Sequence, residues 1–350
     1  MICRLFLALC CVVWPFVGQA QDRLRVATWT VELTRNGPGV LLRDILKGDD
    51  VQILAAQSHI KALSPDVLLL VGFDTDLDGH ALAQFARDLD YPYLFTRSGN
   101  SGRSTGIDTD KDGRFGEPED AQSYGEFTGQ GGIAFLSRLP IDVDGIRDFS
   151  EMLWRDLPRA RLPEGYFQPK DLDVVRLSSH AHWDIPVLWN DAPLHLFTYA
   201  AISPVFDGDE DRNGRRNADE TRFWQLYLDG ALALPPPAAP FVILGDSNLD
   251  PSDGDGLRVD MVALLSDPRL QDPKPCSDFG AEIANPDHLG DPALDTANWT
   301  DPVPGNLRVD YVLPSKELAV MDAGVAWPPV DGLETPFRHG LVWVDLARIP

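Results

Sequence analysis

Residues 241–251 read FVILGDSNLDP, and this stretch gives the clearest indication of the fold. Its apolar first part, residues 241–244, has the length and composition of a buried strand. Asp246 and Asn248 follow two residues apart, so an extended backbone would place both side chains on one face. In a polar cleft, a carboxylate and an amide in this arrangement can activate a water molecule and hold a phosphoryl oxygen.

Apolar runs on both sides of this stretch predict further strands. Between them lie segments whose apolar residues recur every three or four positions, which indicates helices. We therefore expect two packed sheets with helices outside, an α/β sandwich. The expected strands are residues 25–33, 66–73, 132–137, 195–202, 241–244, 309–313 and 341–346, and the expected helices are residues 51–63, 80–89, 219–234 and 257–265.

Three more segments show a recognisable order along the chain. They are GGIAFLSRLPI at residues 131–141, RVDYVL at residues 308–313 with Asp310, and RHGLV at residues 338–342 with His339. With the Asp246 segment, they make the chain resemble the endonuclease/exonuclease/phosphatase family, and in particular its secreted bacterial members. The resemblance covers nearly all of the chain after its first twenty residues.

This resemblance implies a DNase I-like fold, a four-layered α/β sandwich of two mostly antiparallel sheets flanked by helices. It also implies that a magnesium ion assists the attack of water on a phosphoester. Asp246 would orient or deprotonate the water, and Asn248 would contact the phosphorus centre. Asp310 would belong to the same polar cluster, and His339 would stabilise charge on the phosphoryl oxygens.

Four positions depart from the family pattern. Thr30 stands where the family places an Asn that contacts metal and phosphate, and Gly72 stands where it keeps its metal-binding Glu. Ala200 replaces an expected catalytic His, and Arg338 stands where many members place an Asp. Because Mg²⁺ is usually held by only one or two carboxylates, loss of the Glu removes its principal anchor. We expect hydrolysis by the usual mechanism to be absent or severely weakened.

Glu32 and Asp74 lie two positions beyond the missing ligands, on the same strand faces but about 6.5 Å away. They leave open a rearranged site for a catalytic divalent metal. Two main functions therefore remain: a degraded family member that binds a small phosphorylated or other ligand in the cleft, or an active phosphodiesterase or phosphomonoesterase. A third alternative is a structural or partner-binding role for an exterior stiffened by calcium.

Two acidic loops follow the spacing D-x-[DN]-x-[DN]-G-x5-E, in which alternate oxygen ligands converge on one Ca²⁺ ion and the final Glu closes the shell. We predict that both are structural calcium sites. The first set of ligands is Asp108, Asp110, Asp112 and Glu119, and the second is Asp209, Asp211, Asn213 and Glu220.

The first twenty residues predict a secretory signal peptide. An apolar run at residues 5–17 follows Arg4, and small residues precede a cleavage site before Gln21. We therefore expect a periplasmic or extracellular protein with one domain spanning residues 21–350. Cys276 is the only cysteine after the predicted cleavage site, so no disulfide within the chain is expected.

The chain has 54 acidic and 30 basic residues, and its formal charge of −24 would repel a polyanion. This disfavours nucleic acid as a partner. We expect a monomer with a small phosphorylated ligand and no membrane partner.

Overall fold

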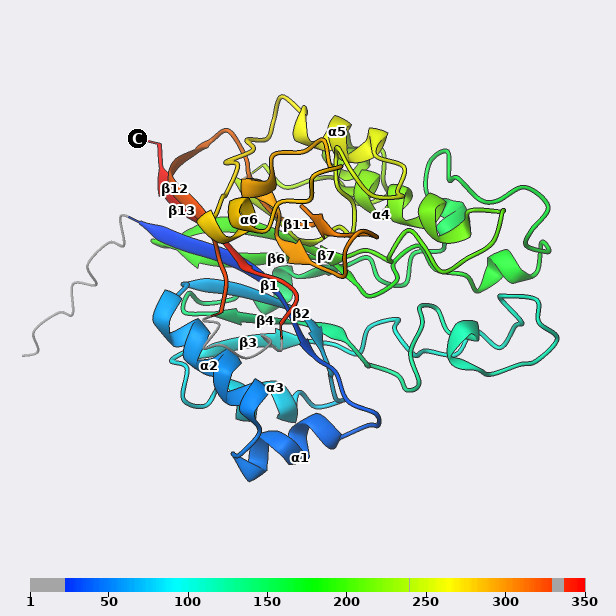
Figure 1. The fold of residues 1–350 in the computed structure, drawn as a ribbon, viewed down its shortest axis with the longest axis horizontal. Helices are drawn as coiled ribbons and strands as arrows, with labels where there is room; N and C mark the ends of the chain where they lie inside the picture. The colour runs from blue at the N-terminus through cyan, green and yellow to red at the C-terminus, as the bar shows by residue number, and fades with distance from the viewer. Residues whose placement is uncertain (1–22, 239, 329–336, 350) are drawn as a thin grey trace, which may run out of the picture.

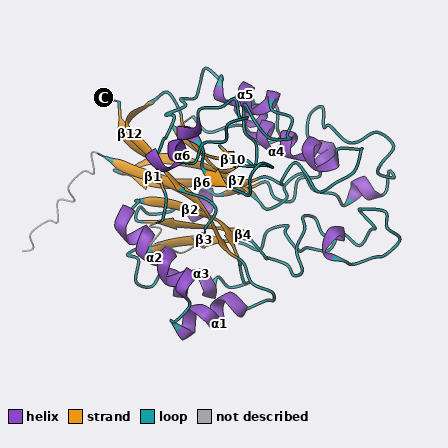
Figure 2. Ribbon diagram, viewed as in Figure 1, coloured by secondary structure: helices purple, strands orange, loops and turns teal. Residues whose placement is uncertain are grey.

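The computed structural model describes residues 23–238, 240–328 and 337–349. The predicted signal peptide, residues 1–20, lies outside the described residues. Two sheets pack face to face, and helices cover the outer face of each (Figures 1 and 2). This architecture confirms the predicted four-layered α/β sandwich with mostly antiparallel sheets.

The first sheet has the strand order β12-β13-β1-β2-β4-β3. β1 and β2 are parallel, and the other neighbouring strands in this sheet are antiparallel. Its strands are β1 (Leu24–Leu33), β2 (Val67–Phe73), β3 (Tyr93–Thr96), β4 (Gly132–Ser137), β12 (Leu318–Ala326) and β13 (Leu341–Arg348).

The second sheet has the order β11-β8-β7-β6-β5, with β7 and β8 parallel. A separate two-stranded ribbon pairs β9 with β10. These strands are β5 (Arg147–Asp148), β6 (His182–Trp189), β7 (Ala192–Ala200), β8 (Phe241–Asp246), β9 (Ala297–Asn298), β10 (Asn306–Leu307) and β11 (Asp310–Pro314).

Three apolar cores hold these layers together. One lies between the two sheets, one lies between the first sheet and helices α1 to α3, and one joins the second sheet to α4 and α5. The helices are α1 (Val40–Lys47), α2 (Val51–Leu63), α3 (His80–Ala86), α4 (Arg212–Leu228), α5 (Val259–Leu265) and α6 (Asp278–Glu282). None of the helices in the described part of the chain combines the length and apolar composition that a membrane span requires.

Two differences from the predicted elements concern α4 and β6. α4 begins at Arg212 rather than near Asp219, and β6 was not predicted. Both segments bury polar side chains, including Asn217 and Glu220 on α4 and Asp184 on β6, all 0% exposed. The polar side chains interrupt the apolar periodicity of the first turns of α4. On β6 the alternate residues Trp183, Ile185, Val187 and Trp189 do form an apolar face in the core between the sheets.

Gly245 allows β7 and β8 to approach each other closely just before Asp246. A Cβ atom at this position would lie 1.9 Å from the carbonyl oxygen of Tyr199 on β7. Only glycine avoids that overlap, so the residue directly before Asp246 has a specific structural role. Long loops extend beyond the sheets at the right of Figure 1.

Candidate functional site

The ends of three strands bring Asp246, Asp310 and His339 together. Asp246 is the last residue of β8, and it lies opposite Asp310, the first residue of β11, in the antiparallel register. His339 comes shortly before β13 in the other sheet. One ligand atom of each residue lies within 4.8 Å of the others, and none of the three residues is more than 3% exposed. The cluster is therefore buried at the junction of the two sheets.

Thr30 on β1 completes the cluster from the first sheet. Its hydroxyl oxygen lies 2.7 Å from Asp310 Oδ1 and 3.3 Å from Asp246 Oδ2. Thr296 donates from its hydroxyl to Asp310 Oδ2 at 2.9 Å. Sequence reasoning treated Thr30 as an inert replacement and missed Thr296, because both contacts depend on how distant segments pack.

The two carboxylates and the imidazole interact strongly. His339 Nδ1 lies 2.7 Å from Asp310 Oδ2. Burial alone would lower the pKa of His339, but the charge of Asp310 and the hydrogen bond to it raise this pKa to about 9. Burial and the nearby charge of Asp310 raise the pKa of Asp246 to about 7. The cluster thus brings a His339 ring whose pKa is raised close to an Asp246 carboxyl whose pKa is also raised.

Asn248 lies beside this cluster but turns toward β7. Its backbone has a positive φ of 47°, and its N–H donates to Asp246 Oδ1 at 2.8 Å. The side-chain amide donates to the carbonyl oxygen of Ala201 at 2.9 Å. Asn248 therefore orients the Asp246 carboxyl through its backbone, while its amide is held at the end of β7.

Neither Ala200 nor Gly72 supplies a reactive group. Ala200 pairs with Asp246 across the parallel strands β7 and β8 and is fully buried. Gly72 has a φ of 69°, and a Cβ atom there would lie 3.2 Å from the backbone nitrogen of Glu32. Glu32 itself has a positive φ of 51°, at the register shift between β1 and β2. The bulged β1 backbone occupies the space beside Gly72.

The other two carboxylates considered from the sequence make different contacts. Glu32 forms an ion pair with Arg338, with Oε1 2.6 Å from Nη2, and accepts the Arg338 backbone N–H at 2.9 Å. Asp74 accepts backbone N–H groups of Arg35 and Gly131, each at 2.8 Å, and burial raises its pKa to about 6. Among the described residues, the group at this end that could hold a cation consists of Asp246, Asp310 and His339.

These contacts differ from the magnesium site that the family resemblance implies. Mg²⁺ prefers six oxygen ligands in near-ideal octahedral geometry. Asp310 already accepts from Thr30 and Thr296, and its pairing with His339 Nδ1 occupies that ring nitrogen. On the side of β1 and β2, Thr30 and Gly72 bring no carboxylate.

The first acidic loop gathers a modified ligand set. Asp108, Asp110 and Asp120 have oxygens within 4.8 Å of one another. The side chain of Glu119 is exposed, whereas the neighbouring Asp120 is 2% exposed and accepts the N–H of Thr109 at 2.7 Å. The acid that joins the cluster is thus one position after the predicted Glu, and Asp112 lies outside the group.

The second acidic loop does not bring its predicted ligands together. α4 begins at Arg212, so Asn213 lies inside the helix, where its side chain donates to the carbonyl oxygen of Val205. Glu220 is 0% exposed and accepts hydrogen bonds from the backbone N–H groups of Ser179 and Ile202. Its carboxylate therefore links α4 to the second sheet, away from Asp209 and Asp211.

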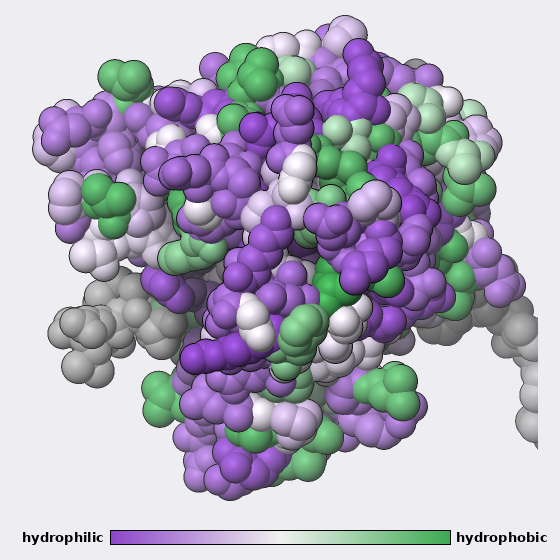
Figure 3. Space-filling model, turned by 90° about the vertical axis from the view of Figure 1, so that its right-hand side faces the viewer, coloured by the Kyte–Doolittle hydropathy of each residue, from purple (hydrophilic) through white to green (hydrophobic). Residues whose placement is uncertain are grey.

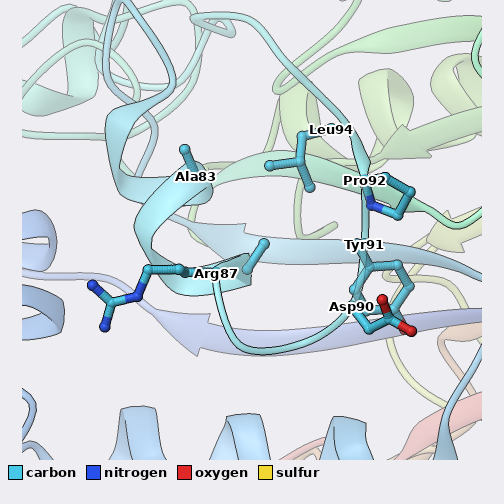
Figure 4. Close-up of a pocket in the computed structure, with 7 residues that line it drawn as sticks. Ala83, Arg87, Asp90, Tyr91, Pro92 and Leu94 are labelled. Atoms are coloured by element: carbon cyan, nitrogen blue, oxygen red, sulfur yellow. The ribbon is translucent and has the colours of Figure 1, made fainter. Parts of the chain in front are cut away.

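The surface around the long loops is mostly hydrophilic, with separate hydrophobic side chains (Figure 3). A pocket of about 250 Å³ lies on a different part of the molecule (Figure 4). Its lining comes from α3 and the connection to β3, which contribute no residue to the cluster. These lining residues include Ala83, Arg87, Tyr91 and Leu94.

Comparison with known proteins gives a family and a fold. No curated protein matches the chain. The solved structure of an endonuclease/exonuclease/phosphatase from Beutenbergia cavernae is 18% identical, with a TM-score of 0.54 over 94% of this chain and 72% of that chain. A family protein from Bacteroides thetaiotaomicron is 15% identical, with a TM-score of 0.51 over 94% and 98% of the two chains.

A family protein from Leptotrichia buccalis is 16% identical, with a TM-score of 0.50 over 92% of this chain and 98% of that chain. At these identities the likeness shows the fold alone. The sequence model of the endonuclease/exonuclease/phosphatase family matches residues 44–335, which is most of the chain. The chain therefore belongs to the endonuclease/exonuclease/phosphatase family.

Proposed function

We propose that the cluster of Asp246, Asp310 and His339 binds the phosphoryl group of a small phosphorylated ligand, with weak or absent metal-dependent hydrolysis. The observation that carries this proposal is the position of Thr30. Its hydroxyl lies between the two carboxylates, and Gly72 beside it offers no metal ligand. The chain keeps groups that recognise a phosphoester and lacks the anchor that would hold the catalytic metal.

The protonation states support recognition of an anion. His339 Nδ1 is engaged by Asp310, so Nε2 is the ring nitrogen that can donate to a phosphoryl oxygen. The raised pKa of His339 keeps the ring cationic at neutral pH. A protonated Asp246 carboxyl can also donate a hydrogen bond to the ligand. The His339 ring and a protonated Asp246 would thus both favour binding of a phosphoester.

The departures from the family pattern account for weak catalysis. Loss of one general acid or base typically lowers a rate by about 10² to 10⁴. Ala200 cannot take part in proton transfer, and Glu32 is engaged by Arg338. The alternative is an active phosphodiesterase or phosphomonoesterase with a rearranged divalent-metal site. In its favour, ligand atoms of Asp246, Asp310 and His339 lie within 4.8 Å of one another.

Turnover measurements decide between these two functions. We expect the wild-type protein and Asp246→Ala to hydrolyse bis-p-nitrophenyl phosphate and p-nitrophenyl phosphate at the same background rate with Mg²⁺, Mn²⁺ or Ca²⁺. Robust hydrolysis by the wild type that Asp246→Ala abolishes would establish the active enzyme and reject our proposal. A contaminating hydrolase would leave its activity in both preparations.

We also propose that the loop around Asp108, Asp110 and Asp120 holds a structural calcium ion. Asp108 Oδ1 is shielded from solvent and has no hydrogen-bond partner in the described structure, so it is available to a cation. Calcium should raise the melting temperature of the wild type and not that of Asp120→Asn. An equal rise in both proteins would show that calcium binds elsewhere.

The cellular location and the oligomeric state of the protein are also proposals. A cleaved leader would place the protein in the periplasm or outside the cell, where millimolar calcium would fill even weak sites. Mass spectrometry of the secreted protein should give Gln21 as its first residue. Light scattering should give the mass of a monomer, and an uncleaved or dimeric protein would contradict these expectations.

A further inference from the structure

Arg338 is the exposed cation closest in sequence to the buried cluster. It directly precedes His339, and its side chain is 61% exposed. The backbone around it is fixed, because its carbonyl oxygen accepts the N–H of Asn298 at 2.7 Å and its own N–H donates to Glu32. The guanidinium thus extends from a fixed backbone and contacts Glu32 through Nε and Nη2.

The charges at this end form two pairs. His339 pairs with Asp310 inside the cluster, and Arg338 pairs with Glu32 at its edge. The two pairs lie within electrostatic reach of each other, since the charge of Glu32 acts on His339. Each pair is formally neutral, so Asp246 is the carboxyl of the cluster that neither pair balances.

The outer pair is the weaker of the two. An ion pair exposed to solvent contributes little net free energy, because water solvates both partners when they separate. The Arg338 side chain is 61% exposed and can reach another anion, while Glu32, which is 18% exposed, would keep the hydrogen bond from the Arg338 backbone N–H. Its planar guanidinium presents two parallel N–H groups that match the oxygens of a phosphate.

We propose that Arg338 supplies the positive charge that receives the phosphoryl group, so that the site binds phosphate and small phosphomonoesters without a divalent metal. This inference rests on the proposed function, and it assigns to Arg338 the contact that a metal ion would otherwise make. The same guanidinium repels a divalent cation that approaches from the side of Glu32. Metal-free binding and poor metal retention thus have one cause.

Phosphate binding in the presence of EDTA tests this role. Inorganic phosphate and phenyl phosphate serve as probes, followed by ³¹P NMR line broadening and calorimetry. We expect saturable binding by the wild type, at least about ten-fold weaker binding by Arg338→Ala, and an intermediate loss in Arg338→Lys. Glu32→Gln should strengthen binding, because it releases the guanidinium from its present partner.

Arg97→Ala is the matched control. Arg97 is 50% exposed and forms a comparable ion pair with Asp148 at 3.1 Å, but it lies outside the cluster. Its removal should leave phosphate binding unchanged. Circular dichroism of each variant checks that the fold is intact.

The possible failures are distinguishable. Binding that requires Mg²⁺, or equal affinity in the wild type and Arg338→Ala, would overturn the role of Arg338 and leave phosphate recognition in place. If the wild type shows no saturable binding with or without Mg²⁺, the proposed function fails as well. An equal loss in Arg97→Ala would show that affinity follows net charge rather than the Arg338 contact.

Discussion

Thr30 shows how a single hydroxyl can stabilise two neighbouring carboxylates. Its one proton can be donated to Asp310, the closer partner at 2.7 Å. The same hydroxyl also lies within donating distance of Asp246, 3.3 Å from its Oδ2. Burial and the charge of Asp310 raise the pKa of Asp246, whereas the Thr30 hydrogen bond lowers it. The Thr30 hydroxyl thus reduces the repulsion between the two carboxylates.

Asp295 is a second buried acid with a raised pKa, and it lies next to Thr296. It is 7% exposed, and burial together with the charges of Asp250, Asp253 and Asp291 raises its pKa to about 7. No hydrogen bond or cation among the described residues contributes to this shift. Its charged form is therefore unfavourable in the folded protein.

We predict that Asp295→Asn stabilises the protein at pH 8. The pKa of Asp295 is higher in the folded protein than in the unfolded protein. Its contribution to the free energy of unfolding is therefore fully present below about pH 4 and is lost as pH rises through about 7. The gain in unfolding free energy should be on the order of 1 kcal/mol at pH 8 and smaller at pH 5. Urea denaturation at both pH values measures it.

Asp49→Asn is the control for this change, because Asp49 is exposed to solvent. It should alter stability little and equally at both pH values. Destabilisation by Asp295→Asn at pH 8 would mean that the carboxylate has a favourable partner when charged.

At the level of elements, the junction of β1 and β2 explains why the family's metal-binding Glu would not fit here. Glu32 and Gly72 both have positive φ angles where the register of these strands shifts. The β1 backbone then lies against Gly72, with Glu32 N at 3.2 Å from a Cβ built there. A larger residue at position 72 would displace the β1 segment that carries Glu32. This shift would also disturb the ion pair between Glu32 and Arg338.

We predict that Gly72→Ala destabilises the protein more than Gly39→Ala. Both glycines have positive φ angles, 69° and 74°, but no atom lies within 4 Å of a Cβ at Gly39. Gly39→Ala should therefore cost only the left-handed strain, about 1–2 kcal/mol. Gly72→Ala should add the cost of moving Glu32. Equal urea midpoints for Gly72→Ala and Gly39→Ala would mean that the β1 backbone at Glu32 does not resist a side chain at position 72.

Whether a helix or strand could be predicted from the sequence depends on which residues its buried face contains. Residues 132–137 were predicted with the bounds that β4 has, because all six are buried and most are apolar. Residues 212–218 of α4 were missed because their buried side chains include Asn213, Arg216 and Asn217. Such polar contacts are satisfied by distant segments, so they leave no local pattern in the sequence.

The same reasoning applies to the site. The family resemblance identified Asp246, Asp310 and His339, which the structure places together. The ion pair between Glu32 and Arg338 spans opposite ends of the chain, and no spacing rule predicts it. Sequence therefore located the cluster, while the contacts that decide its chemistry required the folded structure.

On the scale of the whole molecule, the site depends on the packing of two sheets. Thr30 comes from the first sheet, and Asp246 and Asp310 come from the second. The long loops are also joined to each other: Tyr166 donates to the carbonyl oxygen of Thr109, and the Lys111 ammonium lies 3.8 Å from the Tyr166 ring centroid. The acidic loop is thus held to the loop between β5 and β6, which contains Tyr166.

The proposed function requires that the cluster of Asp246, Asp310 and His339 does not anchor a divalent metal. The most direct measurement is an anomalous diffraction map of crystals soaked in Mn²⁺, which shares the oxygen ligands of Mg²⁺. We predict no manganese peak bound to Asp246 or Asp310. A peak about 2.1 Å from oxygens of both carboxylates would contradict the account and show that a metal site survives.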